Sequence, residues 1–178
     1  MDVRLAILSE RWMQQLIRED EETLRHLILD GGWQEFIARQ SFAESIQEGF
    51  ARAFFREQFL VGFGTAHLVP ELYLPDGVRA AECGTYLRPA FRGKHCNIPC
   101  KEALLREVER CLPVDWCFFL VAHDNFRAQR AMVKLPWPIH VYPPDAPGPF
   151  ARYQRRKSWE LGVPQILYAL EPSSLHPN

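Results

Sequence analysis

The chain has 178 residues and a formal net charge of −1 at pH 7, and 47% of its residues are hydrophobic. This length is ample for one compact core, so we expect a single domain over residues 1–178. The sequence contains no run of about twenty apolar residues, and Arg4, Glu10 and Arg11 interrupt the N-terminus where a leader would be apolar. We therefore expect a cytoplasmic protein without a membrane partner.

Five cysteines in a chain without secretory signals indicate reduced thiols rather than disulfides. His95, Cys96 and Cys100 lie close together, but a zinc site needs a fourth ligand and the usual short ligand pairs are absent. We therefore expect no bound metal. A helix N-terminus beside Lys94 could activate Cys96 as a reactive thiol, although a structural residue is the favoured interpretation.

The N-terminal part has apolar residues at helical spacing. Glu10 to Leu29 predicts a helix that ends at Gly31-Gly32, and Trp33 to Phe55 predicts a second helix or two shorter ones. We therefore expect residues 1–56 to be a helical region. Its aromatic residues are expected in the core, because such stripes are more often core than pocket.

Two strands are predicted next, over Phe59–His67 and Ala80–Leu87, with a turn at Pro75-Asp-Gly77. The second strand runs into a basic turn and then a helix near 97–112, for which Asn97 is a suitable N-cap. Arg92 and Lys94 lie beside the positive end of this helix, and the backbone N–H groups of residues 93–98 point into the turn. The turn thus suits a phosphate or a diphosphate, with an ordinary solvated turn as the alternative.

Further on, the continuous apolar run Trp116–Ala122 predicts a buried strand, parallel to the strand before the helix. A helix is expected after Asn125, the proline-rich residues 138–149 are expected to be loop or edge, and Gln165–Leu170 is expected to be the last strand. Basic residues gather near the C-terminus, and we interpret them as a solvated face, with an acidic macromolecule as the alternative partner and nucleic acid as a weaker one; they are Arg152, Arg155, Arg156 and Lys157. Tyr153 and Trp159 beside them are expected to be packing residues.

Residues 79–137 resemble the acetyl-CoA-binding core of the GNAT superfamily of N-acyltransferases, and most closely its ribosomal-protein alanine acetyltransferase-like branch. The match lies in Arg92, Gly93, Lys94, Cys96 and Asn97, followed by Asn125, Ala128, Lys134 and Leu135. His95 stands where the family usually has glycine. The resemblance implies an α/β fold, a single GNAT-type domain with a mixed central sheet and helices on both faces, in which residues 1–56 would lie on the acceptor side.

The resemblance also implies a site. Glu82 would be the general base, and a backbone N–H near Leu87 would polarise the thioester. A charge paired with Arg79 or Arg88 is the alternative role for Glu82. The residues expected to bind the cofactor are Tyr86, Leu87, Arg92, Gly93, Lys94, His95, Cys96, Asn97, Asn125 and Ala128. Met132 occupies the position where many family members have a tyrosine acid, for which His123 is a possible substitute.

The expected activity is transfer of an acetyl group from acetyl-CoA, the cosubstrate, to a primary amine of a small molecule or a protein. A homodimer is one oligomeric state that stays open. Two alternatives stay open. One is a catalytically degenerate CoA-binding or sensor module of the same fold, favoured by His95 and Met132. The other is an enzyme similar to acyl-homoserine-lactone synthases. No nucleic-acid partner is expected, because no motif of a nucleic-acid-binding fold accompanies the basic residues.

Overall fold

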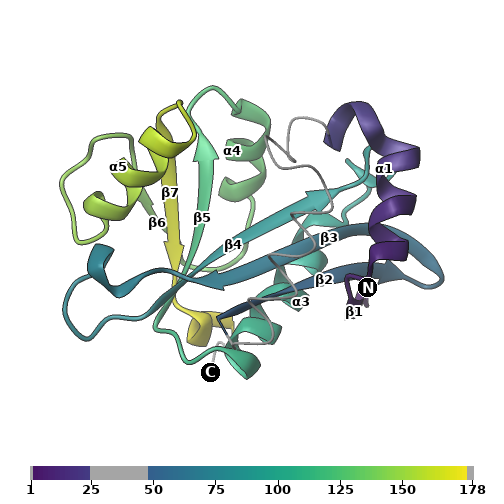
Figure 1. The fold of residues 1–178 in the computed structure, drawn as a ribbon, viewed down its shortest axis with the longest axis horizontal. Helices are drawn as coiled ribbons and strands as arrows, with labels where there is room; N and C mark the ends of the chain where they lie inside the picture. The colour runs from purple at the N-terminus through teal and green to yellow at the C-terminus, as the bar shows by residue number, and fades with distance from the viewer. Residues whose placement is uncertain (1, 25–47, 176–178) are drawn as a thin grey trace. The chain divides into compact units, whose positions relative to one another are not determined.

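The structure is a computed structural model that describes residues 2–24 and 48–175. Figure 1 shows its helices and strands in chain order. They are β1 Arg4–Ile7, α1 Glu10–Leu24, β2 Gly49–Arg56, β3 Phe59–Leu68, β4 Ala80–Leu87, α3 Asn97–Cys111, β5 Trp116–Ala122, α4 Phe126–Val133, β6 His140–Tyr142, α5 Ala151–Glu160 and β7 Gln165–Leu170. Three short 3-10 helices, Glu71–Tyr73, Pro89–Phe91 and Pro172–Leu175, lie among them.

The described strands form one mixed sheet in the order β1-β2-β3-β4-β5-β7-β6. The pairs β1–β2, β2–β3, β5–β7 and β7–β6 are antiparallel, whereas β4 and β5 are parallel. The parallel register joins Ala80–Glu82 to Trp116–Phe118, and β4 continues to Leu87. This arrangement confirms the predicted α/β class with a mixed central sheet.

The chain divides into two compact units, and β4 and α3 each contribute residues to both. The first unit comprises residues 1–67 and 85–104, and its core includes Met13 and Leu16 of α1 with Phe55 of β2 and Phe63 of β3. Trp12 packs edge-on against Phe55 with ring centroids 5.0 Å apart. Apolar residues of α1 recur about every third or fourth position, which places them on the one face that this core buries.

The second unit comprises residues 68–84 and 105–178. Its core is aromatic and is built around Phe118 of β5, whose ring lies 4.7 Å from that of Phe150 at the start of α5. β7 is buried at every position because it lies between β5 and β6 in the sheet. Figure 1 shows β5, β7 and β6 side by side.

Most of the predicted elements are confirmed, including β3, β4, α3, β5, α4 and β7. The proline-rich segment is mostly loop and contributes only the short edge strand β6, as its five prolines require. The helix that we expected to continue through Phe55 is wrong for residues 49–56, which form β2. Nearly every residue of β2 is buried, so it lacks the alternation of a half-exposed strand, and its phenylalanines mimic helical spacing.

Two elements were not predicted. β1 pairs with β2, so the region 1–56 contains two strands besides its helix, and α5 follows the proline-rich segment. The predicted helical residues 25–47, with Gly31-Gly32, lie outside the described part of the chain. None of the helices in the described part is long and apolar enough to cross a membrane.

All five cysteines are free thiols, and only Cys111 is exposed. Burial raises the pKa of the Cys100 thiol to about 12, with a smaller contribution from Cys96. Cys96 is 2% exposed and its Sγ lies 3.5 Å from the carbonyl oxygen of Lys94. These surroundings are those of inert structural thiols, because a reactive cysteine must be accessible as a thiolate.

Alkylation of the native protein with iodoacetamide at pH 8 should therefore modify Cys111 and leave the four buried thiols intact. Peptide mass spectrometry identifies the modified residue, and the protein unfolded in urea, which should react at all five cysteines, is the control. Modification of Cys96 as fast as Cys111 in the native protein would instead mark Cys96 as a reactive thiol.

Candidate active site

The turn that joins β4 to α3 holds most of the residues expected to bind a cofactor. After the 3-10 helix Pro89–Phe91, residues 92–95 form tight turns and α3 begins at Asn97. Cys96 O accepts the amide hydrogen of Cys100 at 3.1 Å, so Cys96 and not Asn97 occupies the cap position. Pro99 lies in the first turn of α3, where a missing N–H breaks no helical hydrogen bond.

Two residues of this turn have left-handed backbone conformations. Gly93 has φ +74°, and a side chain there would meet no atom within 4 Å. His95 has φ +57°. The residue at which the GNAT pattern has glycine thus adopts the conformation that glycine favours, and a histidine in it costs about 1 kcal/mol. The imidazole is exposed, so no core packing offsets this strain.

The turn leaves a group of backbone donors unused. Among residues 2–24 and 48–175, no backbone carbonyl accepts a hydrogen bond from the amides of Gly93, Lys94, His95, Asn97 or Ile98. These donors lie at or just before the N-terminus of α3, where the helix dipole is positive. A set of such donors is suited to the oxygens of a phosphate or diphosphate.

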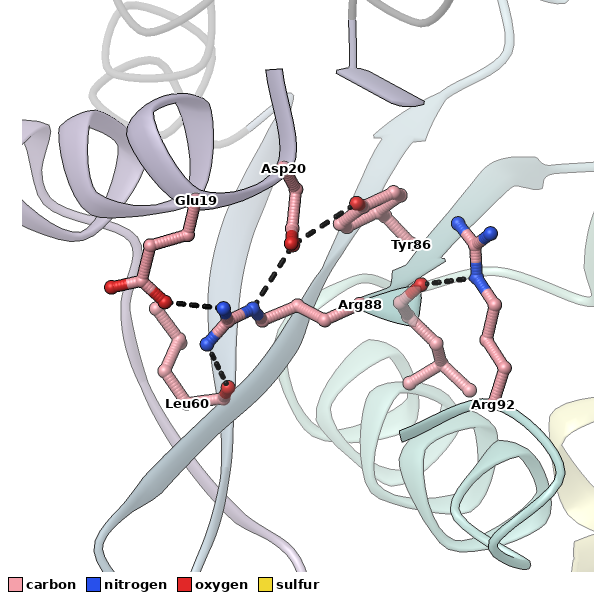
Figure 2. A network of polar contacts seen from close by, with 7 residues as sticks. Glu19, Asp20, Leu60, Tyr86, Arg88 and Arg92 are labelled. Atoms are coloured by element: carbon pink, nitrogen blue, oxygen red, sulfur yellow. Dashed lines mark hydrogen bonds and ion pairs between the residues drawn. The ribbon is translucent and has the colours of Figure 1, made fainter. Parts of the chain in front are cut away.

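Arg92 is held at the edge of this group of amides. Its Nε donates to the carbonyl of Leu87 at 2.8 Å, and its guanidinium lies 5.6 Å from the centre of the Tyr86 ring. Figure 2 shows the two terminal nitrogens of Arg92 directed away from the dashed contact that its Nε makes. Lys94 is exposed, with its ammonium 5.9 Å from the Phe91 ring. Both cations can therefore meet an anion without breaking the contacts that position them.

The backbone of Leu87 faces the edge of β4 opposite β3. The amide of the next residue, Arg88, donates to Val61 O of β3 at 3.0 Å, and neighbouring residues of a strand direct their polar groups to opposite edges. Leu87 O accordingly lies on the side where Arg92 reaches it. The N–H of Leu87 points away from β3, as Leu87 O does. It could therefore donate to a ligand on that side of β4.

A buried ionic network lies behind this end of β4 (Figure 2). Arg88 donates to Glu19 and, at 3.0 Å, to Asp20 Oδ2, while its third nitrogen donates to Leu60 O at 3.2 Å. The hydroxyl of Tyr86 donates to the same Asp20 oxygen at 3.2 Å. Asp20 departs from helical geometry, with φ −130° and ψ 25°, at a kink in α1. The network thus joins α1, β3 and the end of β4.

This network fixes the charge states of Arg88 and Tyr86. Burial opposes the charge of Arg88, but the hydrogen bonds and negative charges of Asp20 and Glu19 outweigh it and raise the pKa of the guanidinium. Burial and the Asp20 charge raise the pKa of Tyr86 to about 12, so its hydroxyl remains a neutral donor. Arg88, which we considered as a partner of Glu82, is instead bound to α1. The side chain of Tyr86 is used in packing against Phe63, 5.4 Å between rings.

The second unit contains Glu82, the expected general base, in a pair of contacts with α5. The hydroxyl of Tyr153 donates to Glu82 Oε2, and Lys157 Nζ lies 3.3 Å from the same oxygen. The carboxylate side chain is 19% exposed, as is that of Lys157. The other suggested partner, Arg79, uses its backbone N–H to bind Asp115 Oδ2 at 2.9 Å. Glu82 is therefore a half-buried carboxylate between a hydroxyl and an ammonium.

Sequence reasoning missed both partners of Glu82. Tyr153 was expected to pack, and its ring does lie in the core beside Phe118 and Tyr73. Burial and the charge of Glu82 raise the pKa of Tyr153, so its hydroxyl keeps its proton. Lys157 was expected on a solvated face and is instead paired. The available signal was their spacing of four residues, which places two side chains on one face if the segment is helical. Trp159, expected to pack, is 74% exposed.

Asn125 and Ala128, also in the second unit, form a helix cap. Asn125 Oδ1 accepts the amide hydrogen of Ala128 at 3.1 Å and so satisfies one of the donors at the start of α4. Met132, where the family has a tyrosine acid, is 2% exposed, and His123 has an exposed side chain. No group of three or more His, Cys, Asp or Glu side chains in the described residues is placed to hold a metal ion.

The chain is similar to known proteins in its structure. No protein-family profile matches the sequence, and no curated protein is similar to it by sequence. The structure is similar to that of RimJ from Mycobacterium smegmatis in complex with CoA-disulfide, with a TM-score of 0.71 and 12% identity over 99% of this chain and 85% of that one. The chain has the GNAT fold.

Two further GNAT structures cover nearly the whole chain. Spermidine N-acetyltransferase from Vibrio cholerae, in complex with CoA and spermine, has a TM-score of 0.67 and 10% identity over 98% of both chains. An acetyltransferase from Salmonella typhimurium that modifies the N-terminal serine of ribosomal protein L7/L12 has a TM-score of 0.68 and 13% identity over 96% of this chain and 95% of that one. The GNAT fold predicted from residues 79–137 is thereby confirmed for the chain as a whole.

The ionic network of the first unit predicts unequal effects of two neighbouring carboxylates. Asp20→Ala leaves Arg88, whose side chain is 14% exposed, and the Tyr86 hydroxyl without their acceptor, so the free energy of unfolding should fall by about 3 kcal/mol. Glu19→Ala is the matched control; the Glu19 side chain is 38% exposed, and its loss should lower stability by less than about 1 kcal/mol.

Urea denaturation measures both changes. Adding Arg88→Met to Asp20→Ala should restore much of the lost stability, because the buried charge is removed together with its partner. Equal effects of Asp20→Ala and Glu19→Ala would show that burial does not make the Asp20 contacts stronger.

Proposed function

We propose that this protein is an N-acyltransferase that transfers the acetyl group of acetyl-CoA to a primary amine. The observation that carries the proposal is a group of amides, those of Gly93, Lys94, His95, Asn97 and Ile98, to which no backbone carbonyl of the described residues is bound, with the cations of Arg92 and Lys94 beside them in a chain with the GNAT fold. Three of the similar structures contain CoA, CoA-disulfide or acetyl-CoA. A diphosphate is the anion that such a run of donors and two cations would hold.

The cofactor would then be bound mainly through the backbone. Amides of residues 93–98 would donate to the diphosphate, and the terminal nitrogens of Arg92 would pair with one of its oxygens. The N–H of Leu87, directed away from β3, would donate to the thioester carbonyl and to the oxyanion that forms from it. Tyr86 would contribute through its backbone, because its hydroxyl is bound to Asp20.

The chemistry requires an amine that has lost its ammonium proton. The nitrogen lone pair would attack the thioester carbon, and the Glu82 carboxylate would accept the proton that the nitrogen loses. The tetrahedral intermediate would collapse by breaking the C–S bond, which leaves an amide and the CoA thiolate. That thiolate would be neutralised by the proton released from the amine. The acceptor is accordingly assigned by class, as a primary amine of a small molecule or a protein.

A second candidate is a CoA-binding module without transferase activity. Met132 favours it, because a buried apolar side chain stands where the family's proton donor would be. The strained His95 is a second departure from the family pattern. Both candidates bind CoA, so only turnover separates them.

A thiol-release assay with acetyl-CoA tests the proposal. We expect release that depends on an added amine, from a panel of spermidine, lysine, and peptides with N-terminal serine or alanine. Glu82→Gln should lower kcat at least about 100-fold, since general-base catalysis contributes that much, while calorimetry shows unchanged binding of acetyl-CoA. Glu71→Gln, which makes the same change at an exposed position, should retain full activity.

The outcomes distinguish the candidates. Absence of acetyl-CoA binding would refute both. Binding without amine-dependent release would favour the module. Full activity of Glu82→Gln at every pH would leave the transferase in place and remove Glu82 as its base.

His95 offers a separate prediction about the turn. His95→Gly should tighten CoA binding about fivefold and raise the melting temperature, because it removes both the imidazole and the left-handed strain. His95→Ala is the control that removes the imidazole but keeps a side chain at φ +57°, so it should not raise the melting temperature. Calorimetric titration measures the affinities. Unchanged or weaker binding by His95→Gly would mean that the histidine is accommodated or contributes a contact.

A further inference from the structure

The inner face of α5 directs two side chains at one carboxylate oxygen. Tyr153 and Lys157 are four residues apart, which places them on the same side of the helix. The Tyr153 hydroxyl donates to Glu82 Oε2, and Lys157 Nζ is 3.3 Å from that atom. A hydroxyl and an ammonium both stabilise the ionised form of a carboxylate.

The second unit holds α5 firmly in place. Gln154 is 1% exposed, and its Nε2 lies within 3.0 Å of three carbonyls, those of Tyr142, Pro143 and Gln165. Ser158 Oγ accepts the amide hydrogen of Gln165 at 3.0 Å. These hydrogen bonds tie α5 to β7 and to the end of β6. The two side chains that reach Glu82 therefore start from a fixed backbone.

Other groups of the second unit near Glu82 have contacts of their own. Glu160 Oε2 lies 3.6 Å from Lys157 Nζ, so the ammonium is shared between two carboxylates. Cys83 is buried with its thiol toward Ala81 O, and β5 presents apolar Phe118 opposite Glu82. Tyr73 contributes a ring that packs on Tyr153. The ammonium of Lys157 therefore lies beside both Glu82 and Glu160.

We propose that Tyr153 and Lys157 are positioning residues that hold the Glu82 carboxylate in one orientation, ready to accept the proton of the acceptor amine. This inference rests on the proposed acetyltransferase function. Tyr153 acts as a hydrogen-bond donor and not as the acid that protonates the leaving group. Burial and the neighbouring carboxylate raise the pKa of its hydroxyl, which makes it a poor proton donor.

The resemblance to the family covers residues 79–137 and does not include α5. Tyr153 and Lys157 both come from the connection between β6 and β7. Each makes a separate contact with Glu82 Oε2, so the loss of either should leave the orientation of the carboxylate less restricted.

The test uses Lys157→Met, Lys157→Arg and Tyr153→Phe, with the amine that gives the fastest thiol release by the wild type. Lys157→Met and Tyr153→Phe should each lower kcat about tenfold, with KM for acetyl-CoA changed less than about twofold. Lys157→Arg should keep most of the activity of the wild type, because the cation beside Glu82 is kept. Arg155→Met and Tyr73→Phe are matched controls and should behave as wild type.

A second measurement needs no acceptor. The ¹³C-carboxyl resonance of Glu82, assigned by its loss in Glu82→Gln, should be displaced in Lys157→Met and in Tyr153→Phe but not in Arg155→Met, because only the first two remove a contact of the carboxylate. Circular dichroism of each variant verifies that it is folded.

Each result bears on one assignment. An undisplaced Glu82 resonance and an unchanged kcat in Lys157→Met would overturn the role of Lys157 while leaving the transferase standing. Unchanged kcat in Tyr153→Phe would overturn the role of Tyr153. If Glu82→Gln is fully active, Glu82 is not the base and both positioning roles fail with it. If the wild type neither binds nor turns over acetyl-CoA, the proposed function itself fails.

Discussion

Backbone N–H groups for which residues 2–24 and 48–175 supply no backbone acceptor are the constraint on which the proposed function depends. Buried or not, a peptide donor is normally paired, and helices leave their first donors to side chains, water or ligands. Between β4 and α3 the chain places five such donors, those of Gly93, Lys94, His95, Asn97 and Ile98, and reverses direction through two left-handed residues. The fixed guanidinium of Arg92 adds charge where the amides add direction. One anionic ligand would satisfy all of them together.

Charged side chains hold the backbone before the turn and the side chain of Glu82 in place. In the first unit, Asp20 accepts from both Arg88 and Tyr86, so the last residues of β4 are tied to α1 before the turn begins. In the second unit, Glu82 is tied to α5 in the same way, by a hydroxyl and a cation. Each arrangement buries a carboxylate with two donors, which makes the carboxylate costly to remove and restricts its orientation.

Local features of the chain were predictable from sequence. β4, the turn before α3 and β5 are each formed by one continuous stretch of sequence. Their residue types therefore indicate where the strands lie and which residues could bind an anion. β2 was mistaken for helix because it is buried on both faces, and α5 was missed because few of its residues are apolar. The partners of Glu82 could not be found this way. Tyr153 lies 71 residues further along the chain, and only the packing of α5 brings its hydroxyl to the carboxylate.

The most direct test of the central claim is an amide-resolved NMR titration with CoA and, separately, with pantetheine, which lacks the diphosphate. The account predicts that CoA shifts the amide resonances of Gly93, Lys94, His95, Asn97 and Ile98, and that pantetheine leaves them in place. It would be contradicted if CoA left these amides unmoved while shifting others, or if pantetheine moved them equally.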